Sequence, residues 1–199
     1  MPSSLLSMPE LTAKQKQYQK DIQKLVRTPS KGVEVGHLYN YEYQAKVAEY
    51  WDALPLTLVI AKKSDGWLGL SLHYLPKNIR DYFVRKILIK NLPRLKRGKP
   101  VDVTYEAIKL GDVFYKEGIA IIRRYLASHV RSRIVDIPWK EWLNALSLES
   151  AQWMNTTAAL MYAQSKQIVS GLGKPKLNKT SSNILKKRVN SLKPRGRKK

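Results

Sequence analysis

The stretch that decides the fold runs from residue 51 to residue 76 and reads WDALPLTLVIAKKSDGWLGLSLHYLP. Two runs in it, 56–63 and 67–74, are rich in Leu, Val, Ile and aromatic residues, which favour strands. Ser64-Asp65-Gly66 between these runs is a turn signal. The stretch therefore predicts a β-hairpin over residues 56–74.

Two registers of this hairpin compete. A two-residue turn at Asp65-Gly66 would leave neither face of the hairpin cleanly apolar. A three-residue turn, with Gly66 in the left-handed position of a bulge, pairs Leu58 with Leu72 and gathers the apolar side chains on one face. Because a slip of one residue turns every side chain to the other face, the pattern favours the three-residue turn. The opposite face then carries small residues, which leaves room for another segment to lie close.

Length and composition favour a single domain with tails, since 199 residues can bury a substantial core. The absence of cysteine excludes disulfides and thiolate metal sites. No stretch approaches the length of a membrane span, and the N-terminus lacks the basic start and apolar run of a signal peptide. We expect a soluble, non-secreted protein with no membrane partner.

Net charge is the strongest compositional signal. The chain has 37 Lys plus Arg against 15 Asp plus Glu, a formal net charge of +22. Such an excess indicates a polyanionic partner, most often nucleic acid. Residues 174–199 contain 11 basic residues and no acidic one, so half of the net charge belongs to this tail.

The chain divides into three predicted parts. Residues 1–30 form an N-terminal segment with an amphipathic helix, residues 36–172 form a single α+β domain, and residues 173–199 form a basic, disordered tail. Within the domain, tyrosines alternate with other residues over 36–43, which predicts a strand that pairs with the hairpin. We interpret these tyrosines as a ladder that packs a small sheet rather than as a base-stacking platform.

The remaining segments are predicted from their apolar spacing. Helices are expected near 77–91, 113–131 and 156–169. The last one is expected to start at residue 149 or shortly after and to carry Trp153, Leu160 and Met161. A strand is expected over 133–137, and Pro138 is expected at the first position of a further helix. Residues 101–110 are ambiguous between strand and short helix. The predicted fold class is α+β, with a small antiparallel sheet of three to five strands centred on the hairpin and packed by three or more helices.

The candidate binding residues are basic. From residue 77 to residue 99 there are nine basic residues and one acidic residue, Asp81, which favours a polyanion-facing surface over an ordinary solvated helix face. Three arginines between 124 and 133 form a second basic edge, and the tail adds a third group. No base-reading element is evident, so we expect sequence-independent binding. The nucleic-acid-binding candidates are Lys77, Arg80, Arg85, Lys86, Lys90, Arg94, Lys96, Arg97, Lys99, Arg124, Arg131, Arg133, Lys186, Lys187, Arg188, Arg195 and Arg197.

Signals for catalysis are absent from the sequence. His37, His73 and His129 lie on three different predicted elements, and we interpret each as structural. The chain has no HExxH, no phosphate-binding Gly-rich loop, no GxGxxG, and no Asp-x-Lys or Glu-x-Lys of the kind found in metal-dependent nucleases. We predict no catalytic residue, no metal, no cofactor and no small-molecule substrate.

A set of short motifs runs through residues 36–145. After the tyrosine-rich strand come Asp52-x-x-Pro55-Leu56, Asp65-Gly66-Trp67-Leu68-Gly69-Leu70, Leu72-His73-Tyr74-Leu75-Pro76, Arg124-Tyr125-Leu126, Ser128-His129-Val130-Arg131-Ser132-Arg133 and Ile137-Pro138-x-x-Glu141-Trp142. Taken together, these motifs resemble a family of small virion-associated and morphogenesis proteins of large contractile-tailed phages. The resemblance implies a DNA end protector, a head-completion or neck component, or a baseplate component.

The favoured function is non-enzymatic, sequence-independent binding of DNA, for end protection or head completion. We expect the protein in the virion, and in the host cytoplasm during assembly, with DNA and other phage structural proteins as partners. One alternative is a structural baseplate or neck subunit whose basic tail docks on an acidic protein. A second alternative is an RNA-binding or ribosome-associated protein, whose composition would look much the same.

Overall fold

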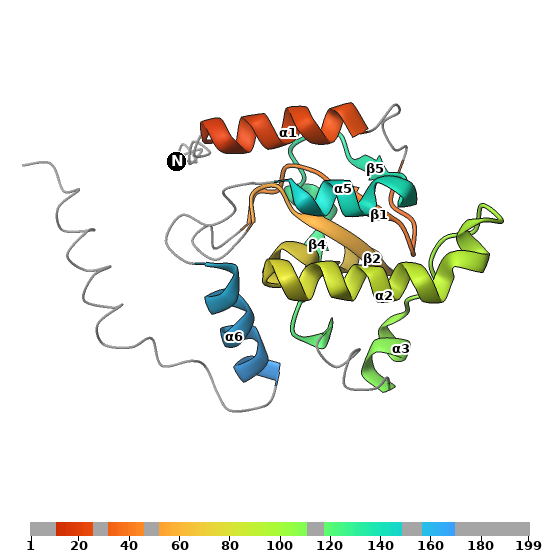
Figure 1. Ribbon diagram of the computed structural model, residues 1–199. Coiled ribbons are helices and arrows are strands. Elements are labelled where there is room, and N and C mark those ends of the chain that lie inside the picture. Colours follow the sequence, from red (N-terminus) through yellow and green to blue (C-terminus); the bar gives the residue numbers. More distant parts are fainter. Residues whose placement is uncertain (1–10, 26–31, 46–51, 111–117, 149–156, 170–199) are drawn as a thin grey trace, which may run out of the picture.

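The computed structural model describes residues 11–25, 32–45, 52–110, 118–148 and 157–169 (Figure 1). Its strands form one antiparallel sheet in the order β4-β3-β2-β1-β5. The strands are β1 (Leu38–Asn40), β2 (Leu56–Lys63), β3 (Gly66–Ser71), β4 (Ile122–Leu126) and β5 (Val135–Ile137). The predicted strand over 36–43 is confirmed, and it pairs with the hairpin as expected.

Helices accompany this sheet, which confirms the α+β class. They are α1 (Ala13–Leu25), α2 (Lys77–Leu95), α3 (Tyr105–Leu110), α5 (Trp142–Ser147) and α6 (Ala158–Val169), with 3₁₀ turns η2 (Leu72–Tyr74), η3 (Ala127–His129) and η4 (Trp139–Glu141). Figure 1 shows α2 in front of the sheet, with α5 and α1 above it. No helix in the described ranges is long and apolar enough to cross a bilayer. The division into segments 1–30, 36–172 and 173–199 stays a prediction, and the tail lies outside the described residues.

The predicted hairpin is confirmed, but its turn differs from the predicted one. Lys63 pairs with Gly66, so the loop contains two residues. Gly66 does not adopt a left-handed conformation, since the described glycines with positive φ are Gly36 and Gly98. A Cβ atom on Gly66 would instead overlap the carbonyl oxygen of Tyr125 on β4. The prediction that Gly66 is left-handed is therefore wrong. Position 66 requires a glycine because the neighbouring strand β4 lies too close for a side chain, and not because of the turn.

The extra residue of the hairpin lies inside β2. Val59 pairs with Gly69 and Ala61 pairs with Leu68, so Ile60 forms a bulge between them. The bulge keeps Ile60 in the main core although the register shifts by one residue. The predicted single apolar face is therefore correct, while the predicted pairing of Leu58 and the predicted turn are wrong.

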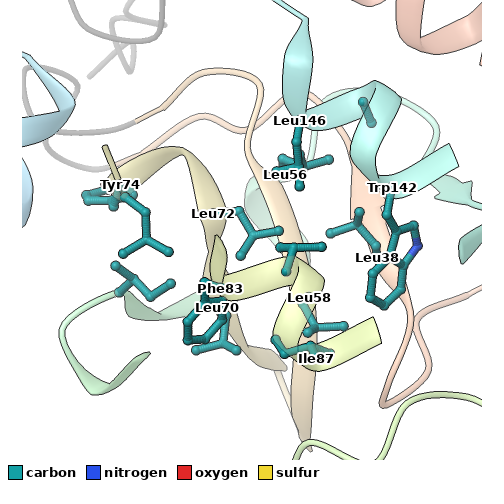
Figure 2. Close-up of a cluster of buried hydrophobic side chains, with 14 of the residues drawn as sticks. Leu38, Leu56, Leu58, Leu70, Leu72, Tyr74, Phe83, Ile87, Trp142 and Leu146 are labelled. Carbon is teal, nitrogen blue, oxygen red and sulfur yellow. The ribbon is translucent and has the colours of Figure 1, made fainter. Parts of the chain in front are cut away.

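The main core lies between this apolar face and the helices. Figure 2 shows buried side chains of the sheet facing those of α2 and α5. Its labelled members are Leu38, Leu56, Leu58, Leu70, Leu72, Tyr74, Phe83, Ile87, Trp142 and Leu146. Tyr18 and Ile22 of α1 belong to the same cluster. Full burial of one such side chain contributes about 1.5–3 kcal/mol. This cluster therefore contributes more hydrophobic stabilisation than the smaller cluster on the opposite face of the sheet.

The opposite face of the sheet carries a smaller, aromatic cluster. Its buried members are Tyr39, Tyr41, Tyr43, Val59, Trp67 and Tyr125. The ring of Tyr41 meets those of Trp67 and Tyr125 edge to face, at centroid distances of 5.3 and 5.7 Å. Its hydroxyl group donates a hydrogen bond to Oγ1 of Thr57 (3.2 Å). The tyrosine ladder that packs the sheet is thereby confirmed, and it occupies the room expected beside the small residues.

The helix predicted over 113–131 is wrong from Ile122 onward, although Gly118 and Ile119 are helical. Ile122–Leu126 is strand β4, which pairs with β3 along its whole length, and residues 113–117 lie outside the described part. Side chains four residues apart, such as those of Ile122 and Leu126, share one side of a helix and also of a strand. The spacing therefore could not discriminate, and the open edge of β3 decided the conformation.

Other boundaries shift in smaller ways. The strand expected over 133–137 is confirmed as β5, and the ambiguous 101–110 segment ends in α3. Pro138 lies at the cap before η4 rather than at the first helical position. Residues 149–156 lie outside the described part, and α6 begins at Ala158. On α6, Met161 is buried and Leu160 is 57 % exposed, and Trp153 lies outside the described part.

Candidate nucleic-acid interface

The outer face of α2 carries most of the basic residues predicted between 77 and 99. A helix repeats every 3.6 residues, so positions such as 82, 86, 89, 93 and 97 follow one side. The exposed cations of α2 and of the turn after it are Lys77, Arg85, Lys86, Lys90, Lys96, Arg97 and Lys99, and Arg94 is half-buried. We call this set, with Arg94, the α2 basic face.

Apolar side chains are interleaved with these cations. Ile89 is 72 % exposed, and Tyr82 and Leu92 are also exposed. The Nζ atom of Lys86 lies 5.3 Å from the centroid of the Tyr82 ring, a cation–π contact. Arg85 pairs with Asp81, the one acidic residue of the helix, at 2.9 Å. The α2 basic face therefore offers positive charge and apolar contact area together.

Arg80 is the exception among the predicted cations, because its side chain points into the protein. It is 7 % exposed, and its guanidinium group donates to the carbonyl oxygens of Leu146 (3.5 Å) and Leu75 (3.4 Å). Burial lowers the pKa of Arg80 below its ordinary value. This position joins the start of α2 to α5, so Arg80 serves the fold and does not face solvent.

Arg80 belongs to a buried polar cluster with Tyr18, Asp52 and His73. The side chains of His73 and Asp52 form a pair with exposures of 0 % and 2 %. Asp52 also accepts a hydrogen bond from the backbone N–H of Leu54 (3.0 Å), and the Tyr18 hydroxyl lies 3.4 Å from Nε2 of His73. Burial raises the pKa of Tyr18, and the nearby Asp52 raises it further. The cluster links α1, the segment before β2, η2 and α2, which supports a structural role for His73.

The other two histidines lie in different places. His37 pairs with Asp136 at 2.9 Å, which joins the start of β1 to β5. The ring of His129 stacks near Tyr43, and its Nδ1 lies 2.6 Å from the carbonyl oxygen of Gln44. Among the residues that the structure describes, no group of three His, Cys, Asp or Glu side chains could hold a metal ion. The absence of catalytic and metal-binding residues stays a prediction.

The second predicted basic edge begins at the hairpin tip with Arg124 and continues after η3 with Arg131 and Arg133. Arg124 on β4 pairs with Asp65 in the hairpin loop at 2.6 Å, and this hydrogen bond lowers the pKa of Asp65. Arg131 donates from Nε to the side-chain oxygen of Gln44 (2.8 Å). Arg133 is exposed. The sheet thus brings Arg124 close to an acidic loop, which partly neutralises its charge.

Two exposed lysines at this edge were missed from the sequence. Lys62 and Lys63 end β2, and the sheet ladder places Lys62 beside Trp67 and then Tyr125 on β4. Their position just before the turn signal was visible in the sequence, but the neighbouring strand was not predicted. The tail candidates Lys186, Lys187, Arg188, Arg195 and Arg197 lie outside the described residues.

A groove of about 680 Å³ lies where the end of α2 meets η4 and α5, and we call it the Trp139 groove. In Figure 1 the end of α2 lies on the right-hand side of the molecule, below α5 and β5. Its lining includes Leu25, Gly36, His37, Leu95, Gly98, Lys99, Pro100, Asp136, Ile137, Pro138, Trp139, Lys140, Glu141 and Trp142. No sequence pattern pointed to this groove, because its lining comes from five separate segments.

Fold and surface together define a class: a small α+β protein with a basic helix face and no candidate metal cluster in its described part. Comparison with protein families identifies the family within that class. The family model described as Phage T4 terminal DNA protecting protein matches residues 9–170. The chain belongs to this family, which confirms the resemblance to proteins of contractile-tailed phages. No curated protein and no solved structure was found to match the chain.

Proposed function

We propose that this phage protein protects DNA ends by binding duplex DNA through its basic surfaces, without enzymatic activity and without reading sequence. It would act in the virion and at head completion in the cytoplasm of the infected cell. The observation that carries the proposal is the α2 basic face in a chain whose family is that of the terminal DNA protecting protein. The tail and the 124–133 edge would add further phosphate contacts.

The geometry of α2 supports backbone contacts. A helix of 19 residues is about 28 Å long and can follow several phosphates of a duplex. Lysines predominate among its exposed cations, and a lysine binds phosphate as a point charge, without the fixed fork that arginine offers to a guanine edge. Such contacts position a protein on DNA but carry no sequence information.

The salt dependence of DNA binding tests this proposal. Log affinity should fall with log salt by about 0.9 per phosphate contacted. If the tail makes half of its possible contacts, deletion of residues 174–199 should lower that slope by about 5. Reversing Lys86, Lys90 and Lys96 to Glu should lower it by about 3 more.

A matched control separates the α2 basic face from net charge. Lys14, Lys16 and Lys20 are exposed on α1, and their reversal to Glu changes the net charge by the same amount. The α1 variant should keep most of the slope that the α2 variant loses. Equal losses would contradict the assignment to α2. A full-length protein that binds no linear duplex, or leaves its ends open to an exonuclease, would refute the proposed function itself.

The non-enzymatic part of the proposal has its own test. Purified protein should leave linear and circular duplex DNA intact in Mg²⁺ or Mn²⁺, because the chain lacks the acidic residue and lysine spacing of a metal-dependent nuclease. Cleavage that follows the protein through purification and disappears on replacement of one carboxylate would overturn it.

A second candidate function is docking on an acidic phage protein during assembly. The exposed Tyr82, Ile89 and Leu92 favour it, because DNA binding does not need an apolar helix face. Ile89→Ser should then reduce incorporation into particles while DNA affinity stays unchanged. Equal incorporation of this variant would exclude docking through α2.

A further inference from the structure

We propose that the Trp139 groove receives the terminal nucleotide of a DNA strand, with the indole ring of Trp139 against the last base and Lys99 and Lys140 at the phosphates. This inference rests on the proposed function of DNA end protection. It adds a site that distinguishes a DNA end from the interior of a duplex.

End protection requires more than the α2 basic face. Phosphates are the same along the whole duplex, so backbone contacts bind the interior as well as the end. A terminus differs because it exposes the face of the last base and a phosphate or hydroxyl group that no further nucleotide follows. A concave site with an aromatic ring and cations can recognise these features, whereas a convex helix face cannot.

The groove has the size and lining that such a site needs. Its volume of about 680 Å³ falls within the range of about 300–1,000 Å³ that is typical of small-molecule sites. Leu95, Ile137 and Trp142 provide an apolar floor. The indole N–H of Trp142 is already bound to the carbonyl oxygen of Ile137 (2.8 Å), and its ring is buried. Trp139 is only half-buried, so its ring is the one that can stack on a base.

Two lysines supply positive charge at the groove. The Nζ atom of Lys140 lies over the Trp139 ring, 5.9 Å from its centroid, so this flexible side chain would move from the ring to a phosphate when a base stacks there. Lys99 reaches the groove from the turn after α2 and is exposed. Lys96 and Arg97 lie in the same turn and connect this end of the α2 basic face to the groove. A duplex lying along α2 would therefore bring its end to Trp139.

The two carboxylates of the groove are engaged by neighbouring side chains. Asp136 pairs with His37 at 2.9 Å, and the hydrogen bond from this partner raises the pKa of His37, which favours its protonated form. Glu141 accepts a hydrogen bond from the side-chain amide of Asn144 (2.7 Å). Asp136 thus has a partner that can carry positive charge, whereas Glu141 keeps its negative charge because an amide donor does not neutralise it. Lys99 and Lys140 supply the positive charge that an anionic nucleotide would need.

The test compares a 5′-phosphorylated linear duplex with a closed minicircle of the same length and sequence. Trp139→Ala should weaken binding to the linear duplex about 5- to 150-fold, the range expected for loss of one stacked base, and leave minicircle binding unchanged. Trp139→Phe should restore most of the preference for ends. Lys99→Ala with Lys140→Ala should also lower that preference.

The matched control is Lys86→Ala with Lys90→Ala, which removes the same charge from the α2 basic face and should weaken both DNAs equally. Thermal melts of each variant report whether it is folded. If the wild type prefers ends and folded Trp139→Ala keeps the same preference, the groove assignment is overturned while end protection stands. If the wild type shows no preference and protects no ends, both proposals fail.

Discussion

The buried polar cluster and the hairpin tip each hold a hydrogen-bonded pair of side chains, in opposite surroundings. Asp52 and His73 are almost completely enclosed, with Arg80 nearby. Asp65 and Arg124 form their pair with side chains about half exposed to water. Loss of one partner from a buried pair costs about 3–5 kcal/mol, whereas an exposed pair contributes about 0–1 kcal/mol. Breaking the interior pair should therefore cost more stability than breaking the surface pair, which adjusts the charge that a partner meets.

The largest expected effect is that of Asp52→Ala. It leaves His73 without its partner and the N–H of Leu54 without an acceptor, so unfolding in urea should show a loss of about 3–5 kcal/mol. Asp65→Ala, which breaks the exposed pair with Arg124, should change stability by less than about 1 kcal/mol. Similar losses for the two variants would contradict the comparison.

The second largest loss of stability is expected for Gly66→Val. The charged side chains of the hairpin tip are exposed, but the backbone at Gly66 packs tightly against β4. Any Cβ atom at Gly66 overlaps the carbonyl oxygen of Tyr125, so strand β4 must move away. We expect a loss of about 3 kcal/mol from the thermal melt. Gly32→Val is the control, since no atom lies near a Cβ at that position. An unchanged melting temperature for Gly66→Val would argue against the β3–β4 register.

Arg80→Met and Arg85→Met compare a buried and an exposed arginine of the same helix, α2. Two backbone carbonyls lose a charged donor, so stability should fall by about 1–3 kcal/mol, while the DNA affinity of the folded protein stays the same. Arg85→Met, on the exposed side of α2, should do the reverse: stability changes little and the salt dependence of DNA binding weakens. Paired denaturation and binding curves check both variants. Lower DNA affinity in folded Arg80→Met would place Arg80 in the interface after all.

The smallest effect concerns pH. The hydrogen bond to Asp136 raises the pKa of His37 in the folded protein, so its stabilisation is complete below the ordinary histidine pKa of about 6.5. It is lost as the pH rises through the raised value. Both side chains are about a third exposed, so the change should stay below about 1 kcal/mol. Urea midpoints across this range should fall in the wild type more than in His37→Gln, and parallel curves would exclude this pair as the cause.

Local pattern predicted much of the fold. The alternation of tyrosines correctly predicted the strand near Leu38. The leucines of the hairpin correctly predicted the apolar face of that hairpin. The bulge at Ile60 and strand β4 escaped prediction, because each depends on a partner strand that is distant in sequence. The same limit applied to the candidate site: seven of the cations between 77 and 99 are exposed, but nothing in the pattern separated Arg80 from them.

The sequence by itself determined the α+β class, the hairpin, the tyrosine ladder, the excess of positive charge and the phage family. These are properties of composition, short motifs and residue periodicity, which act locally along the chain. Only the tertiary structure decided that Arg80 is buried, that Asp65 partly neutralises Arg124, and that Lys99 and Trp139 line one groove. The physical reason is that burial, pairing and concavity depend on which distant segments meet, and that is settled when the sheet and its helices pack together.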